Sequence, residues 1–322
     1  MNRERIGKFL IKISVLFIII GCRNFIYDAL VDNFFLNKNV TFTNKNEYYL
    51  TYNYNYIKNV DEFNIRNKQD LLDLYYTVIN SGVDEFEFYC PKEYENCIED
   101  ITEITNDQDY LSDINGFVHP YNSFDTIETT YDTMRRVYIH ITKTYSEKDI
   151  IAINEKVDEI IKDVVKDEKD IKKKLELIHD YIVENTKYDR DRADRNITTF
   201  QSNTAYGVFF QGYGICSGYA DAMGIFLNRY NIPNYKIASE NHVWNAVKID
   251  GKWYHLDLTW DDPLTENETD VVLHDYFLIT TDKLRTLDKT QHTYNDSVYT
   301  EMRIPKVEKE REMEEAEEVK EA

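Results

Sequence analysis

Apolar side chains recur along the first half of the chain with two different periods. Helical spacing and strict alternation follow each other, which predicts helices and strands in turn. The predicted helices cover 67–80, 91–104 and 146–165, and the predicted strands cover 84–90 and 136–142. Ser146 is placed to cap the last of these helices. Segments in this order predict a small α/β unit over residues 61–165.

Residues 212–263 show a different pattern, which begins with a helix. One predicted helical face carries four large side chains at spacings of 4, 3 and 4 residues, namely Tyr219, Met223, Phe226 and Tyr230. Cys216 falls in the first turn, between Gly212, Gly214 and Gly218, which let the backbone turn sharply. Unpaired N–H groups and the positive end of the helix dipole favour a thiolate there. Cys216 is therefore a candidate nucleophile.

A β-hairpin is predicted directly after this helix. Residues 242–249 and 252–258 are rich in valine, tryptophan, tyrosine and isoleucine. They flank Asp250–Gly251, the strongest short signal for a two-residue hairpin turn. This turn would place Ile249 opposite Lys252, which fixes the register of every other pair in the hairpin.

The register places two histidines and one aspartate on the same face of the hairpin. Trp244 lies opposite Asp257, and alternation brings His242 and His255 to the same face. His242 and Asp257 become diagonal neighbours, about 7–8 Å apart. Considered alone, a cysteine such as Cys216 is more often a small core residue than a nucleophile, and a single strand histidine is more often a structural group than a base. Together they favour a nucleophile, a base and its orienter, with His255 as a competing base.

Four sequence motifs carry a family resemblance. GICSGYADA surrounds Cys216, HVWNAVKIDGKWYHLD starts at His242, and DLTWDDP starts at Asp257. Upstream, KLELIHDYIVENTKYD covers 174–189. The stretch 166–285 resembles the transglutaminase-like superfamily, a papain-like cysteine fold that also occurs in peptide N-glycanases and bacterial proteases.

The resemblance implies both a fold and a set of roles. The fold is α+β: a helix carrying the cysteine packs on an antiparallel sheet, and the core with its closing strands spans 166–305. Independently of the resemblance, the residues DYFLIT predict another core strand at 275–280. Cys216 would be the nucleophile, His242 rather than His255 the base, and Asp257 the orienter. Candidate substrate-binding residues are Trp244 and Gly214. No cofactor and no metal are expected.

Composition limits the range of partners. The 322 residues allow two domains, and 42% hydrophobic with 14% aromatic residues allow a sizeable core. The formal net charge of −21 opposes nucleic-acid binding. The charged tail at 306–322 is interpreted as a solvated or frayed helix.

The N-terminus predicts export. Residues 1–22 combine a basic start with a short apolar run that ends at Cys22, which resembles a lipoprotein leader whose cysteine is acylated. An uncleaved N-terminal anchor is the alternative. Either would hold the protein at the membrane and the cell surface. Residues 23–60 are predicted to be a tether with early strands near 48–56.

Two further cysteines form a candidate disulfide. If Cys22 carries lipid and Cys216 is the nucleophile, Cys90 and Cys97 remain as a pair, and an exported protein permits their oxidation. No histidine or cysteine cluster with zinc spacing lies beside them.

Two classes of function remain open. In the first, the chain is an exported cysteine enzyme that attacks a protein or peptide amide, including cell-wall peptides, through a thioester. Water as acceptor would make it a protease or amidase, and an amine would make it a transglutaminase. In the second, it is a catalytically inactive surface binding protein on the same scaffold.

Overall fold

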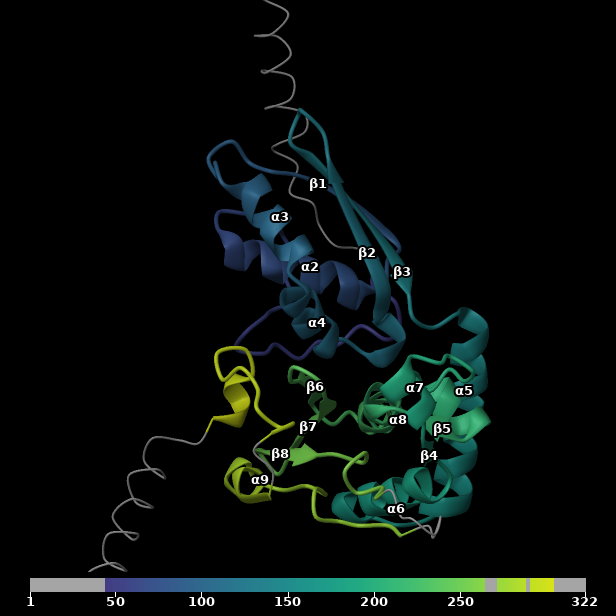
Figure 1. Cartoon of the computed structure of the whole chain (residues 1–322). Coiled ribbons are helices and arrows are strands. Elements are labelled where there is room, and N and C mark those ends of the chain that lie inside the picture. The colour runs from purple at the N-terminus through teal and green to yellow at the C-terminus, as the bar shows by residue number, and fades with distance from the viewer. Residues whose placement is uncertain (1–43, 264–270, 288–289, 304–322) are drawn as a thin grey trace, which may run out of the picture.

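The structure is a computed structural model that describes residues 44–263, 271–287 and 290–303 (Figure 1). The expected leader with Cys22 and the charged tail at 306–322 lie outside these residues. Within the described ranges, no helix has both the length and the apolar character needed to cross a membrane.

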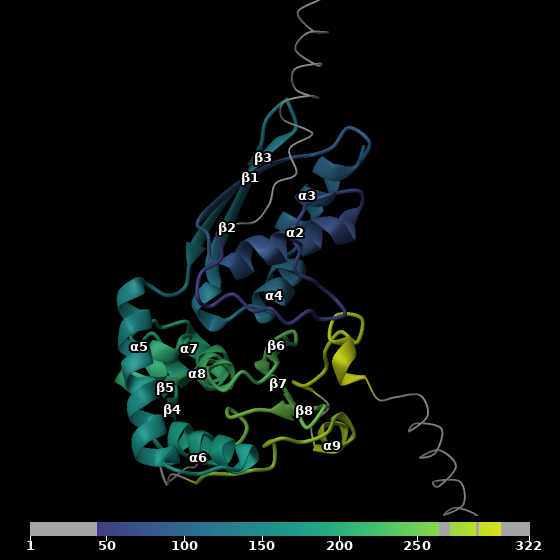
Figure 2. The ribbon, with the colours of Figure 1, turned by 180° about the vertical axis from the view of Figure 1, so that it is seen from behind.

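An antiparallel sheet and three helices form the N-terminal unit. The strands are β1 (Glu85–Tyr89), β2 (Phe124–Tyr131) and β3 (Arg136–Lys143), in the order β1-β3-β2. The helices are α2 (Lys68–Ser81), α3 (Cys97–Asn106) and α4 (Gln108–Gly116), and they lie on one side of the sheet (Figures 1 and 2). Alternation on β3 buries Val137, Ile139 and Ile141 against these helices, as the sequence pattern predicts.

Two elements of this unit have weak sequence signals. Helix α4 is largely polar and buries only Ile114 and Gly116, so its apolar period is faint. Strand β2 lies at the edge of the sheet and has no fully buried residue, so it lacks the alternation seen in β3. The helix expected from residue 91 begins only at Cys97, after a turn. A disulfide joins Cys97 to Cys90, linking the start of α3 to the end of β1.

Residues 48–56 form no strand, so the predicted early strands are wrong. The buried Asn80 side chain accepts a hydrogen bond from Leu50 N (3.0 Å) and donates one to Leu50 O (2.8 Å). A side chain therefore takes the place of a partner strand. Tyr54 is buried in the core, and its hydroxyl donates to Asn234 O at 2.7 Å. The segment is thus packed along the molecule from residue 44 onward.

The second sheet contains the predicted hairpin. Its strands are β6 (Asn234–Ala238), β7 (Val243–Ile249) and β8 (Lys252–Leu256), antiparallel in that order. Ile249 pairs with Lys252, so the predicted register is confirmed. Asp250 and Gly251 have φ values of 52° and 80°, as a turn with two left-handed residues requires.

Helix α8 (Cys216–Arg229) packs on one face of this sheet. Helices α5 (Glu147–Ile160) and α6 (Ile171–Glu184) belong to the same hydrophobic cluster as α8, and α5 lies on the far side of α8 from the sheet (Figures 1 and 2). Helix α5 begins with a capping box at Ser146 and continues into a π-helical turn at Ile161–Val165. Val247, Ile249 and Leu256 of the sheet pack against these helices.

The opposite face of the sheet belongs to the other core. Tyr235, Ile237 and Ala246 pack in the same hydrophobic cluster as the buried residues of the N-terminal unit. Helix α5, expected in that unit, buries its apolar residues with α6 and α8 instead. One thin sheet therefore separates two cores and contributes to both, which gives an α+β fold.

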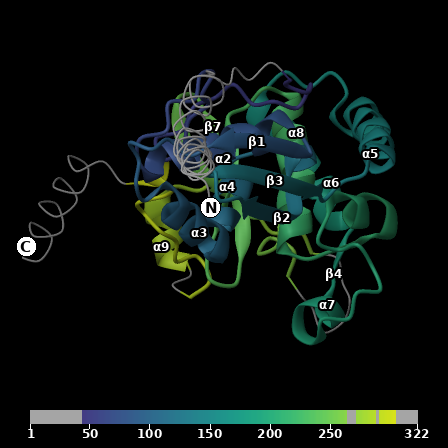
Figure 3. The same cartoon turned by 90° about the horizontal axis from the view of Figure 1, so that it is seen from above.

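Several short elements complete the part of the chain that the structure describes. They are Pro120–Asn122, β4 (Lys187–Tyr188), α7 (Arg190–Arg195), Gly207–Gln211, β5 (Tyr213–Gly214), α9 (Thr281–Leu287) and Thr300–Met302. In the view from above, β4 and α7 lie at the edge of the molecule (Figure 3). The strand expected at 275–280 is wrong, because Leu278 has a left-handed φ of 51° that interrupts extension. Ile279 keeps a single bridge to His255.

Candidate active site

Cys216 is the first residue of α8, and a neighbouring loop fixes this helix start. Ser202 O accepts a hydrogen bond from Ile215 N at 2.8 Å. A Cβ on Gly218 would lie 2.3 Å from the same Ser202 oxygen, so only glycine allows the loop to approach so closely. Cys216 is a free, partly exposed cysteine at this point. Its thiol is therefore held on a rigid helix end and remains accessible.

Gly214, expected to contact substrate, has a packing role. It is buried in β5, which pairs with β4. A Cβ there would lie 2.7 Å from the ring of Tyr219, a core residue of α8. Gly214 therefore lets the chain pass close beneath the cysteine helix.

His242 lies immediately before β7 and is bonded to Asp257. Its Nε2 is 2.6 Å from Asp257 Oδ2, and both side chains are buried. The imidazole also stacks on Trp244, with ring centroids 5.6 Å apart and planes at 15°. The pair is thus brought together across the hairpin, where the register placed them as diagonal neighbours.

Asp257 is oriented by the turn that follows β8. Its Oδ1 accepts hydrogen bonds from Thr259 N at 3.0 Å and Trp260 N at 3.3 Å. Burial alone would raise the pKa of the Asp257 carboxyl, but the charges and hydrogen bonds of His242 and then His292 hold it well below its usual range. The carboxylate is therefore ionised and fixed in position.

His292 is part of the site, although the sequence analysis did not include it. Its Nε2 lies 2.8 Å from Asp257 Oδ2, the same oxygen that His242 contacts. The ring is buried and stacks on Tyr276, with centroids 5.1 Å apart. His292 comes from a polar stretch, QHTYND, that has no periodicity. His292 is 35 residues away from Asp257 in the sequence, and only the tertiary fold brings the two side chains together.

The surroundings of His242 suit it to act as a base. Burial opposes its charge, but the Asp257 carboxylate and then hydrogen bonding to Cys216 raise the pKa of His242 to about 10. Because Nε2 faces Asp257, Nδ1 is the ring nitrogen left to take up the thiol proton. Cys216, His242 and Asp257 thus form one connected series.

His255 has a different place. Its Nδ1 accepts a hydrogen bond from Trp244 Nε1 at 3.0 Å. Its Nε2 lies 3.1 Å from the hydroxyl of Thr281, which itself donates to Met302 O at 2.8 Å. These contacts assign a neutral ring protonated at Nε2. Burial and then the nearby His292 lower the pKa of His255 to about 3, so it remains neutral and structural at physiological pH.

Trp244, the other residue expected to bind substrate, packs inside the molecule. Its exposed fraction is 1%, and its indole N–H is used by His255. Its contact with His242 means that it supports the imidazole instead of facing the solvent.

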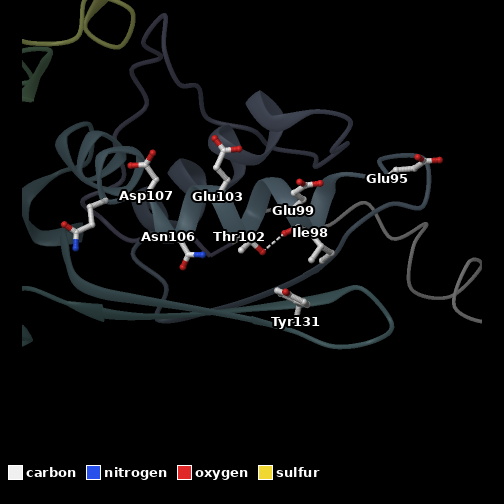
Figure 4. Close-up of a pocket in the computed structure, with 9 residues that line it drawn as sticks. Glu95, Ile98, Glu99, Thr102, Glu103, Asn106, Asp107 and Tyr131 are labelled. Atoms are coloured by element: carbon white, nitrogen blue, oxygen red, sulfur yellow. Dashed lines mark hydrogen bonds between the residues drawn. The ribbon is translucent and has the colours of Figure 1, made fainter.

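A large groove of about 940 Å³ lies elsewhere, in the N-terminal unit (Figure 4). Acidic side chains at four-residue intervals line it, namely Glu95, Glu99, Glu103 and Asp107. Ile98 and Tyr131 also line it. It contains none of the residues bonded to Asp257, so it is separate from the candidate active site.

Comparison with known proteins matches part of the chain to one superfamily. Residues 158–258 match the family model of the transglutaminase-like superfamily. This segment is transglutaminase-like. It includes Cys216, His242 and Asp257, whereas His292 lies beyond it. The fold class is that expected from the resemblance, α+β with a papain-like or transglutaminase-like core.

Two solved structures are similar at low identity. One is described as a TGase, with 15% identity, a TM-score of 0.33 and coverage of 46% of each chain. The other is a candidate cysteine protease from Cytophaga hutchinsonii, with 15% identity, a TM-score of 0.26 and coverage of 42% of this chain and 61% of that one. The chain spans less than two thirds of the length of either structure. No curated protein matches the chain.

Proposed function

We propose that the chain is a cysteine enzyme that acts on protein or peptide amides through a thioester on Cys216. The observation that carries this proposal is the position of His242, which bonds to Asp257 through Nε2 and contacts Cys216. A core-packing role would not need an accessible thiol beside a buried imidazole–carboxylate pair. The transglutaminase-like segment supports the same class of chemistry.

The acylation step uses each member of the series. Because its pKa is raised, His242 already holds on Nδ1 the proton given up by the Cys216 thiol, and the thiolate attacks the amide carbonyl carbon. The N–H groups in the first turn of α8 have no intrahelical acceptor, and they supply donors for the developing oxyanion. As the C–N bond breaks, the imidazolium returns its proton to the leaving amine or ammonia. Asp257 stabilises that imidazolium and holds its orientation.

The second step regenerates the thiol. An acceptor, either water or a primary amine, approaches the thioester, and His242 removes its proton. The acceptor attacks the acyl carbon, the C–S bond breaks, and the thiolate leaves. Water gives hydrolysis and an amine gives transamidation, so the acceptor alone distinguishes protease or amidase from transglutaminase.

The proposed location is the cell surface, with the N-terminal leader or anchor at the membrane. The Cys90–Cys97 disulfide supports this, because disulfides persist in oxidising compartments outside the cytoplasm. Surface proteins and cell-wall peptides are then the substrate class available to Cys216.

Trapping the acyl-enzyme tests the proposal. The full chain and the Cys216→Ala variant would be incubated with glutamine-containing peptides, cell-wall peptides and a fluorescent primary amine. Intact-mass spectrometry would detect an acyl adduct, and ammonia, cleaved peptide or incorporated amine would report turnover. We expect all signals to require Cys216. An alkylatable Cys216 that forms no adduct and turns over no amide in this panel would instead favour the binding-protein alternative.

A further inference from the structure

A second cluster of histidine and carboxylate side chains lies between α6 and the segment that contains Phe277. His179 Nδ1 is 3.0 Å from Asp180 Oδ1, and His274 Nε2 is 2.7 Å from the same oxygen. The three ligand atoms lie within 4.8 Å of one another. The two imidazole rings are 5.1 Å apart at 33°, and His274 comes from 94 residues downstream of Asp180.

A buried carboxylate determines which nitrogen of His179 points into the cluster. Asp261, which is 0% exposed, places Oδ2 3.2 Å from His179 Nε2. Asp261 is itself fixed, because its Oδ1 accepts a hydrogen bond from Tyr276 N at 2.9 Å. His179 Nε2 therefore faces Asp261, and its Nδ1 is directed at the Asp180 carboxylate 3.0 Å away. Carboxylates on both sides of the ring favour a positive charge there, which either a second ring proton or a metal ion supplies.

We propose that this cluster binds a divalent transition-metal ion, zinc by preference, through His179 Nδ1, His274 Nε2 and Asp180 Oδ1. Two imidazole nitrogens and one carboxylate oxygen suit zinc, whereas magnesium and calcium prefer oxygen ligands. A carboxylate behind a ligating histidine, as Asp261 stands behind His179, is the usual support of a metal site. The site departs from the sequence-based expectation of no metal.

The cluster is open on one side. The His274 and Asp180 side chains are 41% and 33% exposed, whereas His179 is fully buried. An ion can therefore enter from solvent and keep a water molecule as its fourth ligand, while the buried His179 holds it on the inner side.

Metal binding would couple α6 to the loop that carries Asp257. Asp261 N donates to Asp257 O at 3.3 Å, and Asp257 N donates to Tyr276 O at 3.2 Å. An ion on His179 and His274 would hold the two ends of this network together. Its proposed role is to stabilise the loop behind the active site without touching the substrate.

Zinc titration of the full chain tests the site, carried out in a Cys216→Ala background because a free thiol also binds zinc. We expect one zinc ion per chain and a rise in the melting temperature. His274→Ala and Asp180→Asn should each weaken binding by about 100-fold or more, since even loss of an outer-shell partner costs 10- to 100-fold. His140→Ala is the matched control, because His140 is an exposed histidine on β3 away from this cluster.

Two readouts keep the result decisive. Co²⁺ should give the visible absorption of a four-coordinate site in the control and lose it in His274→Ala, with circular dichroism confirming that both are folded. His292→Ala separates this site from the buried group of His242, Asp257 and His292, and should retain the ion. Absence of stoichiometric binding, or binding unchanged in His274→Ala and Asp180→Asn, would show a hydrogen-bonded cluster only and overturn the proposal.

Discussion

The Nε2 atom of His292 lies 2.8 Å from the carboxylate oxygen of Asp257 that also receives His242. One oxygen thus holds the imidazole proposed as the base and a second imidazole from the C-terminal segment. The second ring is too deeply buried to meet a substrate, so its effect on Cys216 must pass through Asp257.

His292→Ala should therefore weaken both stability and thiol reactivity. Removing the donor leaves a buried carboxylate with one partner fewer, which costs about 1–3 kcal/mol. Alkylation of Cys216 by iodoacetamide at pH 6.5 should slow several-fold. His292→Gln, which can still donate, should recover part of the rate. If the alanine variant reacts as fast as the parent, His292 has only a packing role.

The two hairpin histidines should respond in opposite ways. An ordinary thiol is only about 1% ionised at pH 6.5, so His242→Ala should slow alkylation by up to about 100-fold while the fold persists. His255→Ala should keep the fast alkylation but lose about 1–3 kcal/mol, because Trp244 and Thr281 lose their buried partner. Alkylation rates with thermal melting separate the two. The assignment would be contradicted if His255→Ala slowed alkylation of Cys216 and His242→Ala did not.

Asp257→Asn should resemble His242→Ala in a weaker form. The asparagine keeps the shape of the side chain but cannot stabilise an imidazolium or fix its tautomer. The same alkylation assay at pH 6.5 should place its rate between those of the parent and His242→Ala. A rate equal to the parent's would mean that Asp257 does not orient the base.

The raised pKa of His242 predicts how stability depends on pH. Because the folded protein favours protonated His242, that contribution is complete below the ordinary pKa of 6.5 and disappears as pH rises towards about 10. The stability difference between the parent and His242→Gln should therefore shrink between pH 6.5 and 10. Urea melts at several pH values measure it, and a constant difference would be inconsistent with the His242–Asp257 ion pair.

The disulfide should stabilise the N-terminal unit without affecting the thiol. Closing the short loop between Cys90 and Cys97, seven residues apart, is worth about 2–3 kcal/mol by chain entropy. The double variant Cys90→Ala, Cys97→Ala should lose about that much in urea melts. Cys216 alkylation should stay unchanged, because the disulfide and α8 belong to different hydrophobic clusters. A slower alkylation would reveal coupling between the clusters.

Much of the site follows from local sequence rules. The Asp250–Gly251 turn sets the register, and the register places His242 beside Asp257. The start of α8 at Cys216 follows from glycine placement and helical spacing. These features depend on residues close together in the chain.

The remaining features depend on long-range packing. His292 has no local signal, because its burial is decided by Tyr276 and Asp257. The apolar run at 275–280 looks like a strand, but Leu278 adopts a left-handed conformation that no residue type in the run demands. The burial of Trp244 could not be predicted from the sequence, because it depends on His255 accepting a hydrogen bond from the indole N–H.

The sheet shared by the two cores has a consequence for how the chain can be divided. Residues 158–258, the part with recognisable relatives, end before His292 and leave Tyr235, Ile237 and Ala246 without the partners that cover them. A polypeptide cut at those limits would expose an apolar face and lose His292, a hydrogen-bond partner of Asp257. The unit of sequence similarity is therefore smaller than the unit of folding, and the N-terminal helices and the C-terminal segment are structural parts of the transglutaminase-like core rather than appendages to it.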